Sequence, residues 1–236
     1  MCPARAAERS RTGQQLAAIL FDFGGTLDGT LPWKDRMFRL CRAEGVAVTP
    51  ERFDRAFYGA DDALVSAIPE TLPLAATVRR LTTGLGAALD LSDAMAERLA
   101  RRFVDDTTGC VRSNIAILSD LARRYHLGIV SNFYGNLASV CEDLGLRSLF
   151  GVIVDSAAVG FTKPDPRIFT RALDDLGVQA ADATFVGDSL SRDMAGARDI
   201  GMAHIWLAAD GAPQSRPCCP GDRVIRSLAE LRGLLL

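Results

Sequence analysis

An aspartate, Asp22, comes directly after a short apolar run, Ile19 to Phe21. Two glycines and a threonine follow it, so that residues 22–26 read DFGGT. A continuous apolar run closed by glycines is typical of a central parallel strand, because both faces of such a strand are covered. Ligands bind at the carboxyl edge of open α/β sheets, so Asp22 stands where a carboxylate can act on a ligand. The same pattern also fits an aspartate that only begins a turn.

Three further polar clusters follow segments with the pattern of strands or turns. Ser131 and Asn132 end the apolar segment LGIVSN, Lys163 lies in a turn before a helix start, and Asp188 ends TFVGD, five residues before Asp193. Taken singly, each has an ordinary interpretation as a helix cap or a solvated side chain. Their order along the chain predicts that they meet at the same sheet edge as the first aspartate.

The elements that must position these residues are a parallel sheet and its helices. From residue 113 onward helical and strand patterns alternate, with strands expected at 126–131, 152–154, 184–188, 204–208 and 224–225. Helices are expected at 115–125, 136–144, 166–176, 192–200 and 227–235. Such alternation predicts an α/β fold, a Rossmann-like parallel sheet with helices on both faces.

The pattern also divides the chain into parts. Residues 31–107 carry helical patterns, including a helix at 93–104, and few strand signals. We therefore expect a flexible tail at 1–15, a core domain formed by 16–30 and 108–236, and an inserted helical cap domain at 31–107. Because the insertion leaves the sheet beside the first aspartate, it is placed to close over a substrate.

Composition limits the classes of partner. The 236 residues are 48% hydrophobic and 24% charged, with a formal net charge of −2, which favours neither disorder nor a nucleic-acid surface. No secretory signal and no run of about 18 apolar residues is present, so we expect no membrane partner. The six cysteines form no CxxC pair, and Cys218 and Cys219 lie in a loop rich in Gly and Pro. We expect reduced thiols in a cytoplasmic protein, either a monomer or a homodimer.

Together, the four clusters resemble the motifs of the haloacid dehalogenase-like hydrolase superfamily. DFGGT matches the first motif, the Ser and Lys match the second and third, and Gly187 with the two later aspartates matches the fourth, GDxxxxD. The resemblance covers about residues 17–234 and implies a helical cap of the C1 type, which is the type inserted after the first strand.

The resemblance implies a Mg²⁺-dependent phosphatase that acts on a small phosphorylated metabolite. An Asp carboxylate can form an aspartyl phosphate, which splits one difficult step into two. Phosphoryl transfer also needs a cation and fixed donors around the equatorial oxygens. The implied catalytic residues are Asp22, Ser131 and Lys163, the implied substrate contacts are Thr26, Gly25 and Asn132, and the implied Mg²⁺ ligands are Asp22, Asp188 and the backbone carbonyl of Gly24. Asp193 is implied to orient waters or the lysine from behind these ligands.

The sequence departs from the family pattern at Gly24, where the family's phosphatases carry a second aspartate that acts as general acid and base. Such catalysis is typically worth about 10²- to 10⁴-fold. Three outcomes are open: substrates with good leaving groups such as acyl phosphates, another acid as replacement, or a catalytically weakened protein that binds a phosphorylated ligand or a partner. Asp28 is the nearest candidate for a replacement acid.

Two relatives without the second aspartate offer other functions. A phosphonatase-like enzyme needs a cap lysine that forms a Schiff base, and Lys34 is the only lysine in the expected cap. The family's lysine lies later in the cap, where this chain has Arg42 and Ala43. A dehalogenase-like enzyme lacks the GDxxxxD carboxylates in this form, so the presence of Asp188 argues against that function.

Overall fold

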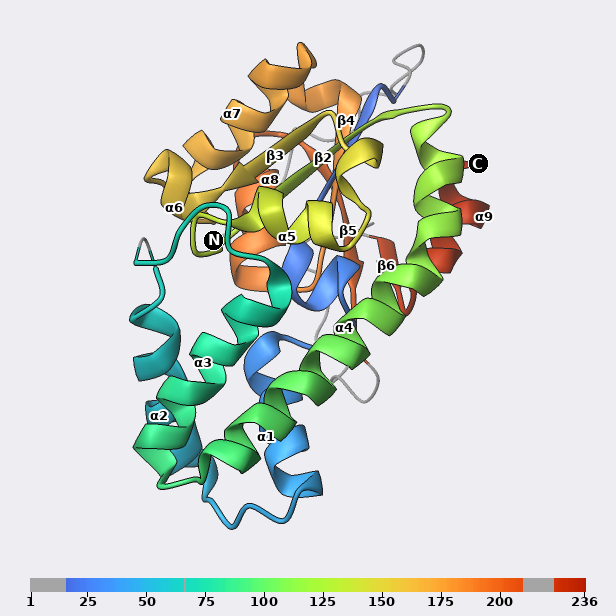
Figure 1. Ribbon diagram of the computed structural model, residues 1–236. Coiled ribbons are helices and arrows are strands. Elements are labelled where there is room, and N and C mark those ends of the chain that lie inside the picture. The colour runs from blue at the N-terminus through green and yellow to red at the C-terminus, as the bar shows by residue number, and fades with distance from the viewer. Residues whose placement is uncertain (1–15, 66, 210–222) are drawn as a thin grey trace, which may run out of the picture.

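The computed structural model describes residues 16–65, 67–209 and 223–236. The expected tail at 1–15 and the pair Cys218 and Cys219 lie outside these residues. In the described chain six parallel strands form one sheet in the order β3-β2-β1-β4-β5-β6 (Figure 1). The strands are β1 Ala18–Phe21, β2 His126–Ser131, β3 Val152–Asp155, β4 Ala183–Gly187, β5 Ala203–Leu207 and β6 Arg223–Ile225. The predicted Rossmann-like α/β fold is confirmed.

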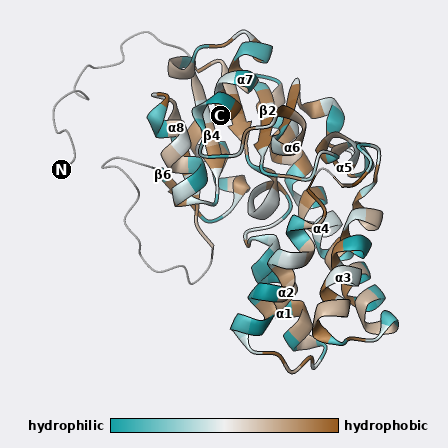
Figure 2. Ribbon diagram, turned by 90° about the vertical axis from the view of Figure 1, so that its left-hand side faces the viewer, coloured by the Kyte–Doolittle hydropathy of each residue, from teal (hydrophilic) through white to brown (hydrophobic). Residues whose placement is uncertain are grey.

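Helices cover both faces of the sheet, and β1 shows how the sequence divides between them. Ala18 and Leu20 point into one apolar cluster, which includes residues of α7 (Pro166–Leu176) and α8 (Ala195–Asp199). Ile19 and Phe21 point into a second cluster on the opposite face, with residues of α5 (Leu137–Asp143) and α9 (Leu231–Leu235). The short α6 spans Ser156–Val159. Figure 2 shows the strands as mainly hydrophobic segments between helices of mixed hydropathy.

Four helices between β1 and β2 form the helical insertion. They are α1 Trp33–Ala43, α2 Pro50–Asp62, α3 Leu74–Leu89 and the first half of α4 Asp93–Ala122. In Figures 1 and 2 they lie together beyond the carboxyl edge of the sheet. Of the described residues, no helix is at once long and apolar enough to cross a bilayer.

The helix α4 differs from expectation. We predicted separate helices at 93–104 and 115–125, which is wrong, because residues 93–122 form one continuous helix. Gly109 in its middle costs about 1 kcal/mol of helix propensity. A continuous stripe of buried side chains that includes Phe103, Val111 and Leu118 offsets this cost. The expected domain boundary at 107/108 therefore falls inside a single rigid element that joins the insertion to the sheet.

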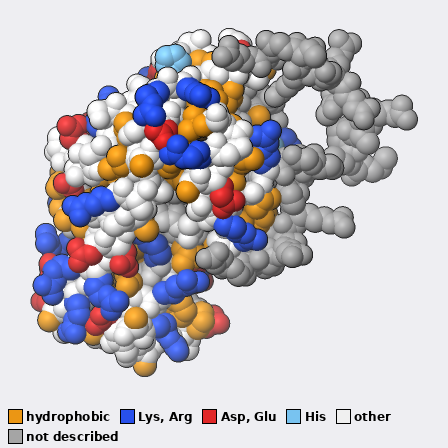
Figure 3. All heavy atoms as spheres, turned by 90° about the vertical axis from the view of Figure 1, so that its right-hand side faces the viewer, with side chains coloured by type: hydrophobic (Ala, Val, Ile, Leu, Met, Phe, Trp, Pro, Cys, Tyr) orange, Lys and Arg blue, Asp and Glu red, His pale blue; other side chains and the backbone are white. Residues whose placement is uncertain are grey.

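The outer surface of α4 carries charges of both signs. Arg102 contacts Glu44 at 2.5 Å, and Arg232 of α9 contacts Asp120 of α4. Figure 3 shows Lys and Arg side chains interspersed with Asp and Glu on this side of the molecule. Paired charges of this kind are typical of a solvated helix face.

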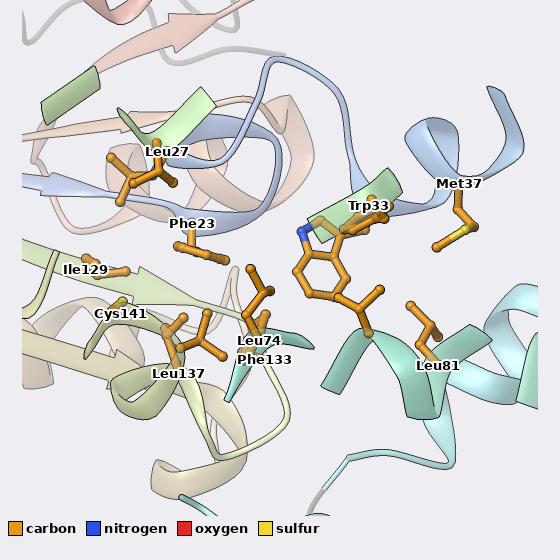
Figure 4. Close-up of a cluster of buried hydrophobic side chains, with 14 of the residues drawn as sticks. Phe23, Leu27, Trp33, Met37, Leu74, Leu81, Ile129, Phe133, Leu137 and Cys141 are labelled. Carbon is orange, nitrogen blue, oxygen red and sulfur yellow. The ribbon is translucent and has the colours of Figure 1, made fainter. Parts of the chain in front are cut away.

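Apolar side chains join the insertion to the sheet layer. Phe23 and Leu27, which follow β1, belong to the same buried cluster as Trp33 and Met37 of α1 (Figure 4). Leu74 of α3 and Phe133, which follows β2, lie between them in the same view. The rings of Phe23 and Phe133 pack edge to face with their centroids 5.6 Å apart, a favourable aromatic arrangement.

A buried ion pair adds to this junction. The side chain of Asp28 is fully buried, and its two oxygens accept hydrogen bonds from Gly25 N at 2.8 Å and from Trp33 Nε1 at 2.5 Å. Arg36 Nη1 lies 3.3 Å from the carboxylate, while Nη2 donates to Thr107 Oγ1 of α4. Burial raises the pKa of Asp28, and the charge of Arg36 opposes that rise. The loop after β1 is thus fastened to both α1 and α4.

Replacing Arg36 with Met should destabilise the protein strongly. The change leaves Asp28 buried without its cation, and breaking a buried pair from one side costs about 3 to 5 kcal/mol. We expect the free energy of unfolding, measured by urea denaturation, to fall by that amount. Arg39→Met, on an exposed position of the same helix, should change it by less than about 0.5 kcal/mol. Equal losses in the two variants would contradict the role of the ion pair.

Candidate active site

The structure brings the predicted polar residues together at the carboxyl edge of the sheet. Asp22 directly follows β1, and its backbone N–H donates to Val186 O of β4 at 2.9 Å. Ser131, the last residue of β2, donates from Oγ to Asp22 Oδ1 at 2.8 Å. Lys163 Nζ lies 2.6 Å from the same oxygen. Parallel strands place these groups side by side because their carboxyl ends share one edge.

Lys163 is the cation at the centre of the site. Its side chain is 2% exposed, and Nζ contacts Asp193 Oδ1 at 2.7 Å as well as Asp22. Burial lowers the pKa of Lys163, but the charges of Asp193 and Asp22 outweigh burial, so its pKa is raised overall. The group is therefore an ammonium ion at neutral pH.

Asn132 positions this lysine through its backbone. Lys163 N donates to Asn132 Oδ1 at 2.7 Å, and Asn132 Nδ2 donates to Lys163 O at 3.2 Å. The two bonds fix the loop before α7 against the end of β2. Asn132 also lines the cavity described below, so the predicted contact with substrate is compatible with its place.

Three carboxylates surround one position beside the lysine. Asp22, Asp188 and Asp193 each offer an oxygen, and these oxygens lie within 4.8 Å of one another. Asp188 Oδ1 is buried and has no hydrogen-bond partner among the described residues. Burial, followed by the charges of Asp22 and Asp193, raises the pKa of Asp188 to about 8. Asp193 accepts a hydrogen bond from Ser189 N at 2.9 Å, which fixes its carboxylate from behind.

This donor set fits a hard divalent cation. One ammonium faces three carboxyl groups, and the raised pKa of Asp188 reflects this shortage of positive charge. An unpartnered buried carboxyl oxygen is also costly. Mg²⁺ prefers oxygen ligands and needs only one or two protein carboxylates. Asp22 and Asp188 are suitably placed, while Asp193 is already held by Lys163 and Ser189 N.

Gly25 is required by the backbone of the loop. Its φ is +84°, a left-handed conformation, and a Cβ there would lie 2.6 Å from Asp188 Oδ2. Its N–H is bound by Asp28 Oδ1, so the structure uses the donor of this predicted substrate contact inside the protein. Thr26 is buried beside it, and its Oγ1 has no hydrogen-bond partner in the described chain.

A cavity of about 360 Å³ opens over these residues. Its sheet side includes Asp22, Gly24, Ser131, Asn132 and Lys163. Its insertion side includes Trp33, Lys34, Phe57, Tyr58, Asp61 and Val65. The exposed side chains of Tyr58 and Val65 lie among these lining residues. The cavity thus has charged groups on the sheet side and mainly apolar groups on the insertion side.

Position 24 carries no carboxyl, and the neighbouring Asp28 does not replace it. A Cβ built on Gly24 would lie 3.5 Å from Trp33 Cδ1, an ordinary contact. Asp28 is absent from the cavity lining, and both of its oxygens accept hydrogen bonds inside the protein. The hypothesis that Asp28 is the replacement acid is therefore wrong, because the carboxyl faces away from any ligand in the cavity.

The sequence interpretation missed a hydrogen-bonded pair in the cavity lining that links the insertion to the loop after β2. Tyr134, three residues beyond Ser131, donates from its hydroxyl to Asp61 Oδ1 of α2 at 2.5 Å. Both residues line the cavity. Asp61 lies one helical turn after the buried Phe57, and this spacing could have placed it on the inward face of α2. Its partner could not have been found from sequence spacing, since 73 residues separate the two.

A family profile matches most of the chain, and individual relatives match about half of it. The profile of the haloacid dehalogenase-like hydrolases matches residues 16–201. Haloacid dehalogenase-like hydrolase domain-containing protein 3 of Bos taurus is 37% identical over 142 residues, which cover 58% of this chain and 56% of that protein. Pyrimidine 5'-nucleotidase YjjG of Escherichia coli is 32% identical over 123 residues, or 51% of this chain and 54% of that one. The chain thus spans about half the length of the curated relatives it matches.

Solved structures share the whole architecture. A HAD phosphatase from Thermococcus onnurineus has a TM-score of 0.60 at 26% identity, covering 93% of this chain and 97% of that one. A 2-haloacid dehalogenase from Pseudomonas syringae has a TM-score of 0.56 at 26% identity, covering 94% and 98%. With the profile match over most of its residues, the chain belongs to the haloacid dehalogenase-like hydrolases.

Proposed function

We propose that the chain is a Mg²⁺-dependent phosphatase that acts on a small phosphorylated metabolite through an aspartyl phosphate on Asp22. One observation carries the proposal: the carboxylate of Asp22 contacts both the Ser131 hydroxyl and the Lys163 ammonium, lies beside two further carboxyl groups and lines a cavity. Relatives named as a pyrimidine 5'-nucleotidase and a phosphoserine phosphatase support a phosphoric monoester as substrate.

In this reaction Asp22 attacks phosphorus and the leaving group departs. Lys163 and Ser131 already contact Asp22 Oδ1, so their donors lie where the oxygens of an incoming phosphoryl group would gather. Mg²⁺ held by Asp22, Asp188 and the carbonyl of Gly24 would add positive charge against the same oxygens. Asn132 and Asp193 keep the lysine in position.

The helical insertion acts as a cap that selects the substrate. It supplies the mainly apolar side of the cavity, including Trp33, Phe57 and Tyr58. We place the protein in the cytoplasm, where the free thiols Cys41, Cys110 and Cys141 of the described chain stay reduced.

A phosphonatase-like function is less well supported. Its Schiff base requires a lysine that becomes neutral. Lys34 lines the cavity, but its Nζ donates to Asp54 at 2.9 Å, and that hydrogen bond raises the pKa of Lys34. Dehalogenation also fits less well, because the reaction has no need for the unpartnered Asp188 carboxylate.

The first test is hydrolysis of p-nitrophenyl phosphate, whose leaving group needs little acid assistance. We expect turnover that depends on Mg²⁺ and falls by about 10³-fold or more in Asp22→Asn. Asp90→Asn, at an exposed position of the insertion, should keep full activity. Phosphate binding without turnover at any pH would indicate the weakened, ligand-binding protein instead.

The second test measures the ion site by thermal unfolding. The folded chain holds the Asp188 proton up to about pH 8, whereas the unfolded chain releases it near 3.8. Ionised Asp188 therefore costs stability that grows as pH rises from about 4 to about 8. Asp188→Asn should raise the melting temperature of the metal-free protein more at pH 8 than at pH 5.

Added Mg²⁺ should reverse the order of the two melting temperatures. Added Mg²⁺ should raise the melting temperature of the wild type and leave that of Asp188→Asn nearly unchanged, because a ligand that binds only the folded state stabilises it. If Mg²⁺ raised the melting temperature of both proteins equally, Asp188 would not be a ligand of the ion.

A further inference from the structure

Hydrolysis of an alkyl phosphate ester in this cavity needs a proton donor, which Gly24 cannot provide. Few carboxyl groups face the cavity. Among the described residues, the lining includes the carboxyls of Asp22, Asp35 and Asp61. Asp22 is held by Ser131 and Lys163, and it is the proposed nucleophile. The Asp35 side chain is 48% exposed and pairs with Lys34. Asp61 is the remaining carboxyl, and it is half-buried.

Asp61 is held in place from the sheet side. Tyr134, in the loop after β2, donates its hydroxyl to Asp61 Oδ1 at 2.5 Å, so the transferable proton belongs on Oδ2. The ring of Tyr134 is itself buried among the aromatic side chains of Trp33 and Phe133. The carboxyl therefore has a fixed orientation although it lies on the insertion.

The surroundings of Asp61 favour its protonated form. Burial raises its pKa, and the charge of the neighbouring Asp62 adds to the rise. The hydrogen bond from Tyr134 and the charge of Arg192, which also lines the cavity, act in the opposite direction. The net direction is upward, as is usual for a general acid that works near neutral pH.

Trp33 lies beside Gly24 in the lining of the cavity. Its indole lies 3.5 Å from the place of a Cβ on Gly24, and its Nε1 donates to Asp28. Because glycine has no proton to give, the donor must come from another part of the cavity lining, and α2 contributes Asp61 there.

We propose that Asp61 is the general acid of this site. The inference rests on the proposed phosphatase reaction and extends it to phosphate esters with poor, alkyl leaving groups. As Asp22 bonds to phosphorus and the ester P–O bond breaks, the Asp61 carboxyl gives its proton to the leaving oxygen, which departs as an alcohol. Water then attacks phosphorus and gives one proton to the Asp61 carboxylate. The P–O bond to Asp22 breaks, phosphate leaves, and the Asp22 carboxylate is restored.

The test compares two substrates by kcat/KM, which reports the steps through departure of the leaving group. Asp61→Asn should lower kcat/KM for an alkyl ester, glycerol 2-phosphate, by about 10²- to 10⁴-fold. For p-nitrophenyl phosphate it should lower kcat/KM by less than about 10-fold, because p-nitrophenolate leaves without a proton. Asp90→Asn, at an exposed position of the insertion, is the control and should change neither value.

A second variant tests the same role without removing the carboxyl. Tyr134→Phe deletes the hydrogen bond that lowers the pKa of Asp61, so the acid stays protonated to higher pH. The alkaline limb of the pH profile of kcat/KM for glycerol 2-phosphate should move upward, while the profile for p-nitrophenyl phosphate should stay in place. A purely structural contact would lower both activities without moving either limb.

The outcomes separate this inference from the proposed function. If the wild type hydrolyses p-nitrophenyl phosphate and Asp61→Asn affects both substrates equally, or neither, the role of Asp61 is overturned and the phosphatase remains. If the wild type hydrolyses neither substrate, both proposals fail.

Discussion

The site depends on one buried ammonium that lies between two carboxylates. Lys163 contacts Asp22 and Asp193 at 2.6 and 2.7 Å, and burial makes each of these charges costly without the others. The third carboxylate, Asp188, has no such partner in the described chain. This imbalance of charge is what suits the cluster to a divalent cation and to a phosphoryl group.

The fold brings Asp22 and Asp188 together through a tight turn after β1 that requires glycine. The turn after β1 passes so close to Asp188 that only Gly25, in a left-handed conformation, fits there. Asp28 binds the Gly25 N–H and pairs with Arg36 of α1, so the same turn is tied to the helical insertion. Support for the nucleophile and support for the lid of the cavity therefore come from one short segment.

The strands of the sheet and the polar residues at its carboxyl edge were predictable from the sequence. The strand at 126–131 is confirmed to the residue, and the other predicted strand ends lie within one residue of those observed, because buried parallel strands are plain apolar runs. The continuity of α4 was not predictable in the same way, since Gly109 and its polar neighbours look like a break until tertiary packing is known. The burial of Asp28 and the pairing of Asp61 with Tyr134 depend on residues that meet only when the insertion folds against the sheet.

The central claim is that the Asp22 carboxylate receives the phosphoryl group. Rapid acid quench during turnover of p-nitrophenyl phosphate, followed by peptide mass spectrometry, measures this directly. The account predicts a peptide containing Asp22 that is heavier by one phosphoryl group. Release of phosphate with the phosphoryl group on a different residue, or on no residue at any quench time, would contradict it.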